Sequence, residues 1–202
     1  MSSVFVRLMQ ESDIDDVVSL QRKCFPEPFP IEFLWNSSHL LSHLSLFGPG
    51  QFVAESAGLI VGSCSNALIS EDTWHQHLPW EQTLGEFDLS GHDPRGTTLY
   101  GADISVLPEF RGRGIGSALY QARFDLVSAL GLVRYGTACR LPGLRDSGLG
   151  ISDYFSGIIS GTVVDRVATP LIKLGLNPLE ILENYMDDEE SLGRALLLEK
   201  LR

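Results

Sequence analysis

The residues with the clearest chemical potential lie in the run 104–123, "ISVLPEFRGRGIGSALYQAR". Small and positively charged residues alternate in its middle, in the order Arg111, Gly112, Arg113, Gly114, Ile115, Gly116. The first N–H groups of a helix have no intrahelical partner, and the helix dipole makes that end electropositive. Because glycines let the backbone approach an anion and arginines add charge, this loop predicts a phosphate or pyrophosphate site.

Three kinds of phosphate-binding loop compete for this run. A nucleotide-hydrolysing loop needs G-x-x-x-x-G-K-[ST], and no Lys follows these glycines. A dinucleotide loop needs G-x-G-x-x-G and a carboxylate at the end of the next strand, but that stretch presents Arg134 and no acid. The third pattern, R-x-x-G-x-G, is matched by Arg111, Gly114 and Gly116.

The run "DISVLPEFRGRGIGSALY" resembles the acetyl-CoA loop of the GNAT superfamily of N-acyltransferases. The resemblance implies acetyl-CoA (coenzyme A) as co-substrate, with its pantetheine arm along the strand before the loop and its pyrophosphate on the loop's backbone. The cofactor-binding residues so implied are Ile104, Ser105, Val106, Arg111, Gly112, Arg113, Gly114, Ile115, Gly116 and Ser117.

The resemblance extends from about residue 73 to the C-terminus, through "CRLPG" and "YMDDEESLGRALLLEK". It points to a GNAT branch whose members occur alone or fused to carbon–nitrogen hydrolases. The chain departs from that branch at Leu107, where a His is expected, and at Leu144, where an aromatic residue is usual. The stretch "LGLNPLEIL" also replaces the common Gly-Phe pair. These departures leave the cofactor loop intact.

Acyl transfer from a thioester to an amine requires a base for the ammonium proton and an acid for the departing thiolate. Asp103 is the first candidate base, because it lies on the strand next to the cofactor loop; a capping or Arg-pairing role is the alternative. The resemblance implies Tyr154, in "SDYFSG", as the acid, and a core aromatic role is its alternative. The oxyanion donor would be a backbone N–H near Val106.

Two charged residues are candidates for binding the acceptor. Arg140, in "CRLPG", presents a planar fork suited to a carboxylate, or else pairs with a surface acid. Glu86, in a long loop, is a candidate substrate-binding carboxylate and, with Asp88, His75 and His92, an alternative base.

The net charge of −11 favours a cationic partner and argues against nucleic-acid binding. An amino-acid-like acceptor would satisfy both this charge and Arg140.

Histidines and cysteines give no metal site. His75 and His77 lack a third ligand at suitable spacing, so we expect no metal. Cys24, Cys64 and Cys139 are far apart and fit neither a disulfide framework nor a C-x-x-C motif, so we expect buried thiols.

The elements that must position these residues follow from periodicity and from Pro and Gly. We expect strands at 4–9, 51–56, 59–69, 97–107, 132–138, 166–174, 179–184 and 194–201, and helices at about 12–24, 31–47, 115–130 and 152–160. "FPEPFP", residues 25–30, is a linker or a rigid substrate-side loop, and 70–96 is a long loop without clear periodicity. The pattern predicts an α+β (mixed α/β) domain. The resemblance implies a GNAT fold with a mostly antiparallel central sheet of about seven strands, splayed at the cofactor-binding strand and flanked by helices.

Length and composition indicate the number of domains, the localisation and the assembly of the protein. The 202 residues, 44% hydrophobic, predict a single domain over 1–202. No apolar run is long enough for a membrane span, and the start "MSSVFVRLMQESD" lacks a signal-peptide pattern, so we expect a cytoplasmic protein without a membrane partner. The apolar stretch "RALLLEKL" makes a homodimer the candidate assembly.

These observations predict an acetyl-CoA-dependent N-acetyltransferase that acts on a primary amine, in a small molecule or a peptide or protein, by direct attack in a ternary complex. A non-catalytic acyl-CoA-binding or regulatory module is the alternative, because the departures at Leu107 and Leu144 fall on the substrate side.

Overall fold

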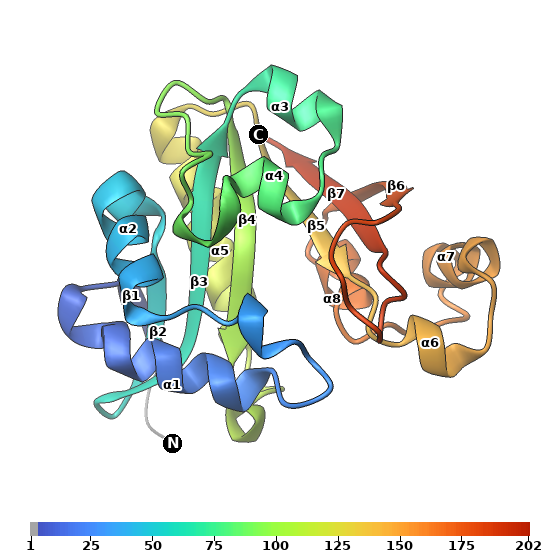
Figure 1. The fold of residues 1–202 in the computed structure, drawn as a ribbon, viewed down its shortest axis with the longest axis horizontal. Coiled ribbons are helices and arrows are strands. Elements are labelled where there is room, and N and C mark those ends of the chain that lie inside the picture. Colours follow the sequence, from blue (N-terminus) through green and yellow to red (C-terminus); the bar gives the residue numbers. More distant parts are fainter. Residues whose placement is uncertain (1–3) are drawn as a thin grey trace.

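The computed structural model describes residues 4–202, which form a seven-stranded sheet in the order β1-β2-β3-β4-β5-β7-β6 (Figure 1). The strands are β1 (Val4–Leu8), β2 (Phe52–Ser56), β3 (Leu59–Ile69), β4 (Thr98–Val106), β5 (Arg134–Arg140), β6 (Asn177–Leu182) and β7 (Ala195–Leu201). All neighbouring pairs are antiparallel except β4 and β5, which are parallel. The predicted mixed, mostly antiparallel sheet is confirmed.

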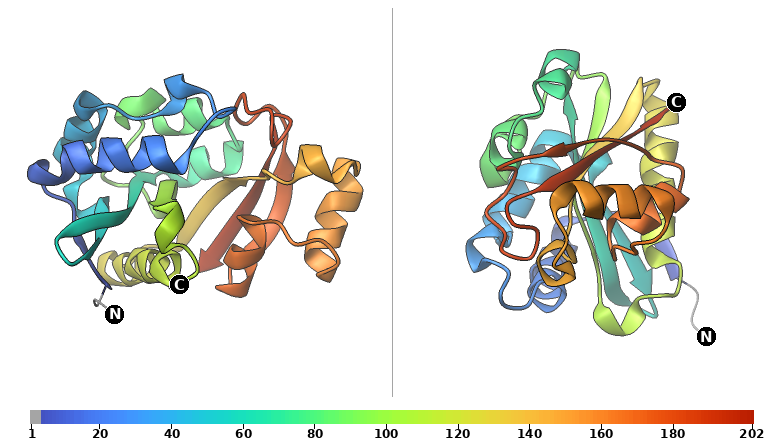
Figure 2. Two further views of the ribbon diagram at one scale, coloured as in Figure 1. Left: turned by 90° about the horizontal axis from the view of Figure 1, so that it is seen from below. Right: turned by 90° about the vertical axis from the view of Figure 1, so that its right-hand side faces the viewer.

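Helices cover both faces of this sheet (Figure 2). They are α1 (Ile14–Cys24), α2 (Ser37–Phe47), α3 (Glu71–Gln76), α4 (Trp80–Leu84), α5 (Ile115–Leu130), α6 (Leu144–Ser147), α7 (Ile151–Ser160) and α8 (Ala168–Lys173). The helices α1 to α4 lie over one face, and α5 and α8 lie over the other (Figure 2, left). Leu119 and Val127 of α5 are buried against the sheet, as its apolar spacing predicts.

The parallel pair divides the sheet. Thr98, Leu99 and Tyr100 of β4 pair with 134–136 of β5, and beyond these residues the two strands diverge, although β4 continues to Val106 and β5 to Arg140. This divergence is the splay expected at the cofactor-binding strand.

Three expected elements differ in the structure. Residues 166–174 form helix α8 and not a strand, because the Asp165 Oδ1 accepts the N–H groups of Val167 and Ala168 and caps a helical turn. The helix expected from residue 31 begins at Ser37, where Asn36 accepts the His39 N–H as N-cap. The expected loop 70–96 contains the short helices α3 and α4.

Candidate active site

The glycine loop joins β4 to α5 through a 3-10 turn, Pro108–Phe110. Gly112 and Gly114 have φ angles of +74° and +81°, in the left-handed region that favours glycine. Gly114 is the N-cap of α5, and within residues 4–202 no side chain caps this helix end. The N–H groups of the first turn therefore point to an exposed surface where an anion can bind.

The space beside the loop suits a ligand. A Cβ built on Gly114 would meet no heavy atom of the described chain within 4 Å, so its positive φ, and not crowding by the protein, requires glycine. Arg111 donates from Nε to the Val106 oxygen at 3.1 Å. Arg113 donates from Nη2 to the Glu109 oxygen at 2.9 Å. Both arginines thus brace the loop and keep their charge beside its amides.

A cavity of about 170 Å³ lies where β4 and β5 diverge, with residues 101–104 and 137–140 in its walls. The remaining walls come from Gln21 of α1, the segment that joins α1 to α2, Trp80, Tyr120 and Arg123 of α5, Val167 and the β6–β7 loop. In Figure 1 the segment that joins α1 to α2 lies in front of this part of the sheet. Of the predicted site residues, the cavity brings together Asp103, Ile104 and Arg140.

A β-bulge aims Asp103 into this cavity. The register between β3 and β4 shifts between Ser65, which pairs with Asp103, and Asn66, which pairs with Gly101, so that Ala102 is the extra residue. The Trp80 Nε1 donates to the Ala102 oxygen at 3.1 Å and fixes the bulge.

The Asp103 carboxyl is held by two polar side chains. Its Oδ2 accepts from the Ser105 hydroxyl at 3.2 Å and from the Gln21 Nε2 at 3.4 Å. Burial raises the pKa of Asp103 to about 6, against the opposing effects of the Arg123 charge and of these hydrogen bonds. A carboxyl with this pKa is ionised at neutral pH and can still take up a proton during a reaction.

Arg123, on α5, is a buried cation in the wall of the same cavity and is 1% exposed. Its Nη2 donates to the main-chain oxygens of Asp103 and, at 3.2 Å, of Ser65. Its guanidinium lies 4.9 Å from the Tyr120 ring centroid and 5.5 Å from that of Tyr135. Arg123 therefore ties α5 to the bulged part of β4.

Sequence reasoning did not identify the aromatic side chains that line the cavity, which are Phe25, Phe29, Phe33, Trp35 and Trp80. Two of them belong to the segment 25–30, whose interpretation as a substrate-side loop fits this position. Gln21 was also missed; its Oε1 accepts from the Trp35 N–H at 2.8 Å, so one buried side chain connects α1, Trp35 and Asp103. The repeated Phe and Pro residues of the segment 25–30 were the sequence signal that could have indicated the aromatic lining.

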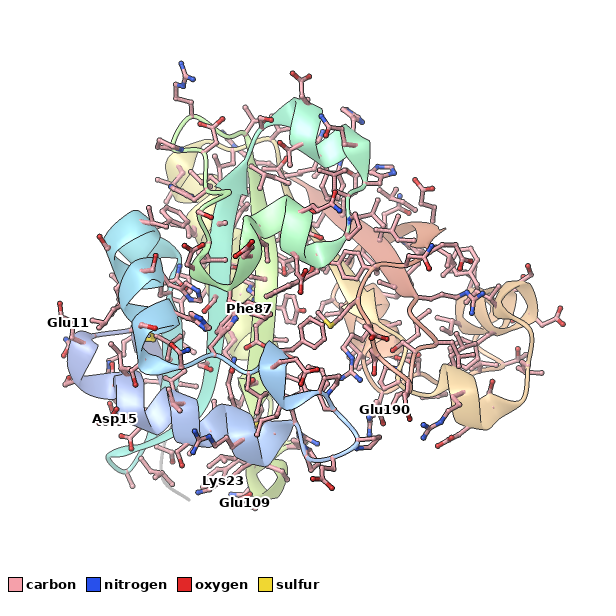
Figure 3. All side chains as sticks on the ribbon, in the orientation of Figure 1. Glu11, Asp15, Lys23, Phe87, Glu109 and Glu190 are labelled. Atoms are coloured by element: carbon pink, nitrogen blue, oxygen red, sulfur yellow. The ribbon has the colours of Figure 1, made fainter. Side chains whose placement is uncertain are left out.

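Arg140 lines the cavity but is already paired. Its Nε and Nη2 donate to Asp188 at 2.8 and 2.6 Å, and Nη2 also donates to Glu190 at 2.8 Å. Its guanidinium lies 4.7 Å from the Phe29 ring centroid. Figure 3 labels Glu190 on the β6–β7 loop, beside the segment that joins α1 to α2. The geometry matches the alternative expectation, in which Arg140 pairs with acids of the protein.

Tyr154 and Glu86 are not brought to the cavity. Tyr154 is buried in α7, and its hydroxyl donates to the Asp165 Oδ2 at 2.8 Å. Burial and this hydrogen bond raise the pKa of Tyr154 far above its ordinary value. Glu86 is exposed in the 3-10 turn Glu86–Asp88. Neither residue lines the cavity, so the acid role of Tyr154 and the binding role of Glu86 gain no support from this geometry.

The histidines and cysteines occupy structural positions. His75 contacts Glu71 at 3.1 Å, and His77 contacts Glu180 at 2.7 Å. In the described part of the chain, no three His, Cys, Asp or Glu side chains come together as a metal site would require. The three cysteines are free and buried, as the sequence predicts.

Comparisons with known proteins show the family of this chain. The family model described as the acetyltransferase (GNAT) family matches residues 14–145. YkwB of Bacillus subtilis, described as an uncharacterized N-acetyltransferase, is 34% identical over 196 residues, covering 96% of this chain and 87% of YkwB. YhcX of the same organism, described as a probable hydrolase, is also 34% identical, but the chain spans 38% of its length.

Among solved structures, the GNAT-like decarboxylase GphF in complex with isobutyryl-CoA superimposes with a TM-score of 0.83 at 23% identity, covering 98% of both chains. The fold of the two proteins is thus alike. The family model over residues 14–145 and the 34% identity to YkwB show that the chain belongs to the acetyltransferase (GNAT) family. The class that these two matches define is the N-acetyltransferases. No helix within residues 4–202 is both long and apolar enough to cross a bilayer.

Proposed function

We propose that the chain transfers an acetyl group from acetyl-CoA to a primary amine, in a small molecule or a peptide, by direct attack in a ternary complex with Asp103 as general base. One observation carries the proposal. Asp103 is the carboxylate in the cavity wall, and it lies on β4 directly before Ile104, Ser105 and Val106, the residues assigned to the pantetheine arm.

The residues present fit coenzyme A. The uncapped N-terminus of α5 and the open space beside Gly114 suit a pyrophosphate, and the end of β4, unpaired with β5, leaves backbone groups for a pantetheine arm. Residues 104–106 and 111–117 would hold the co-substrate. When bound, it supplies an acyl group activated as a thioester.

The chain's own contribution is to bind the amine and to move its proton. An alkyl ammonium has a pKa of about 10, by analogy with Lys, so it must lose a proton before its nitrogen can attack. Solvent takes up this first proton. As the acyl carbon then passes from sulfur to nitrogen, the nitrogen becomes cationic again, and Asp103 accepts its second proton. Because a thiol has a pKa of about 8.5 and the pKa of Asp103 is about 6, the protonated carboxyl can then return the proton to the departing thiolate. No second acid is needed in this scheme.

The test is thiol release from acetyl-CoA across a panel of primary amines, with Asp103→Asn as the variant. We expect turnover to fall about 100- to 1000-fold, the range typical for loss of a general base, with acetyl-CoA affinity near wild type by calorimetry. Asp15→Asn is the matched control, because Asp15 is exposed on α1 (Figure 3) and is not among the residues that line the cavity. Full turnover by Asp103→Asn would contradict the proposal.

Two further measurements distinguish acetyl transfer from the alternative functions. Binding of acetyl-CoA without turnover of any amine would favour the non-catalytic acyl-CoA-binding module. Malonyl-CoA is included because GphF is described as a decarboxylase. Release of CO₂ without amine-dependent thiol release would assign the cavity to decarboxylation.

A further inference from the structure

The cavity has a marked chemical asymmetry that bears on the acceptor. One side, formed by the segment that joins α1 to α2 and by α4, is aromatic. The Phe25 and Phe29 ring centroids are 4.8 Å apart, and those of Phe29 and Phe33 are 6.2 Å apart, so the three rings form a continuous series. Trp35 and Trp80 extend this lining. Such walls bind flat apolar groups through stacked and edge-to-face contacts.

The charged groups that line the cavity are Asp103, Arg123 and Arg140. Arg140 is bound to two carboxylates, those of Asp188 and Glu190, so a substrate carboxylate would have to displace one of them. Arg123 is buried and donates to main-chain oxygens from Nη2. Asp103 is thus the single acid among the cavity-lining residues of 4–202, and it can pair with one ammonium group.

We propose that the acceptor is a small primary monoamine that carries an aromatic or flat apolar group and no carboxylate. The inference rests on the proposed function and narrows it. An amino acid would place its carboxylate beside Asp103, where Arg140 is paired with two acids and Arg123, whose Nε is buried without a partner within residues 4–202, is only 1% exposed. A diamine would place its second ammonium among aromatic side chains with no second acid in the lining.

Four probes of matched chemistry test the inference: 2-phenylethylamine, L-phenylalanine, butylamine and 1,4-diaminobutane. We expect kcat/KM for 2-phenylethylamine to be about 10-fold higher than that for butylamine. We expect it to be about 100-fold higher than kcat/KM for L-phenylalanine or for 1,4-diaminobutane, because each of these would bury an unpaired charge, which is costly. Equal or better use of L-phenylalanine or of 1,4-diaminobutane would overturn the inference. If that use also depended on Asp103, the proposed acyl transfer would stand.

A binding measurement does not depend on turnover. Two of the three tryptophans, Trp35 and Trp80, line the cavity, so 2-phenylethylamine should change the protein's fluorescence in a saturable way without any acyl donor, and L-phenylalanine should not. Saturable binding of 2-phenylethylamine without turnover of any amine would contradict acyl transfer but support the proposed preference for an aromatic monoamine. Absence of both binding and turnover of 2-phenylethylamine would overturn that preference.

The variant Phe33→Ala sharpens this test, with Phe5→Ala as its control. Phe33 lines the cavity, whereas Phe5 is 49% exposed on β1. We expect Phe33→Ala to raise KM for 2-phenylethylamine about 10-fold and KM for butylamine by much less, because only the former needs the ring contacts. Equal effects of both substitutions, in proteins with similar melting curves, would contradict an aromatic subsite.

Discussion

The β4 wall and the β5 wall of the cavity differ in how their polar groups are satisfied. On β4 and its loop, the α5 N-terminus is uncapped, the glycines adopt positive φ, and Asp103 has a pKa raised by burial. At the end of β5, Arg140 is paired with two acids, and beyond this strand the Tyr154 hydroxyl is bound to Asp165. Groups that the fold leaves exposed or destabilised are free to bind substrates, whereas fully paired groups hold the fold together.

Substitution of Gly114 by Val is expected to have the largest effect. A β-branched residue is strained at a φ of +81°, and its side chain would fill the space beside the N–H groups of α5. We expect acetyl-CoA binding to be lost, as measured by calorimetry.

Gly161→Val is the matched control, because Gly161 has a φ of +79° and open space around its Cβ position but ends helix α7. It should lose a similar amount of stability and keep its acetyl-CoA affinity. Unchanged affinity in Gly114→Val would remove the loop from the CoA site.

Tyr154→Phe tests the fully paired groups that lie at the end of β5 and beyond it. The hydroxyl donates to the buried Asp165, which also accepts two N–H groups at the start of α8. We expect the free energy of unfolding to fall by about 1–3 kcal/mol, the cost of an unmade bond to a charged group, and turnover to stay near wild type. Denaturant unfolding and steady-state kinetics measure both. A large loss of kcat with unchanged stability would instead restore Tyr154 as the acid.

Asp103→Asn should have a pH-dependent effect on stability. The pKa of Asp103 is about 6 in the folded state, above the value of about 3.9 in an unfolded chain. As pH rises from 4 to 6, the unfolded state releases this proton first, so the wild type loses stability that the Asn variant keeps. We expect Asn to be about 1–3 kcal/mol more stable than Asp at pH 7 and equal at pH 4. Equal stability at both values would indicate an unshifted pKa.

The strand, turn and helix around the glycine loop could be predicted from the sequence, because they depend on local features. The spacing from Arg111 to Gly116 requires only a strand, a turn and a helix N-terminus, and these are adjacent in the chain. The same local reasoning failed at residues 166–174. There an apolar run predicts a strand, but the Asp165 side chain caps a helix instead.

The acceptor side depends on contacts between distant residues. Gln21 reaches Asp103, 82 positions away, and Arg140 reaches Asp188, 48 positions away. Whether Arg140 is free for a substrate is decided by the β6–β7 loop, which no motif near Arg140 reveals. The bulge at Ala102 is likewise a property of the β3–β4 pairing and has no signature in the β4 sequence.

The most direct test of the account is the pH dependence of kcat/KM for the wild type and Asp103→Asn with one amine substrate. Arg123 on α5, Gln21 on α1 and Ser105 on β4 are the groups that face the carboxyl. The account predicts that wild-type kcat/KM falls below a pH of about 6, as Asp103 takes up its proton, and that the Asn variant is slow with no such acid limb. An acid limb centred near pH 6 that persists in the variant would contradict the assignment of Asp103 as the base.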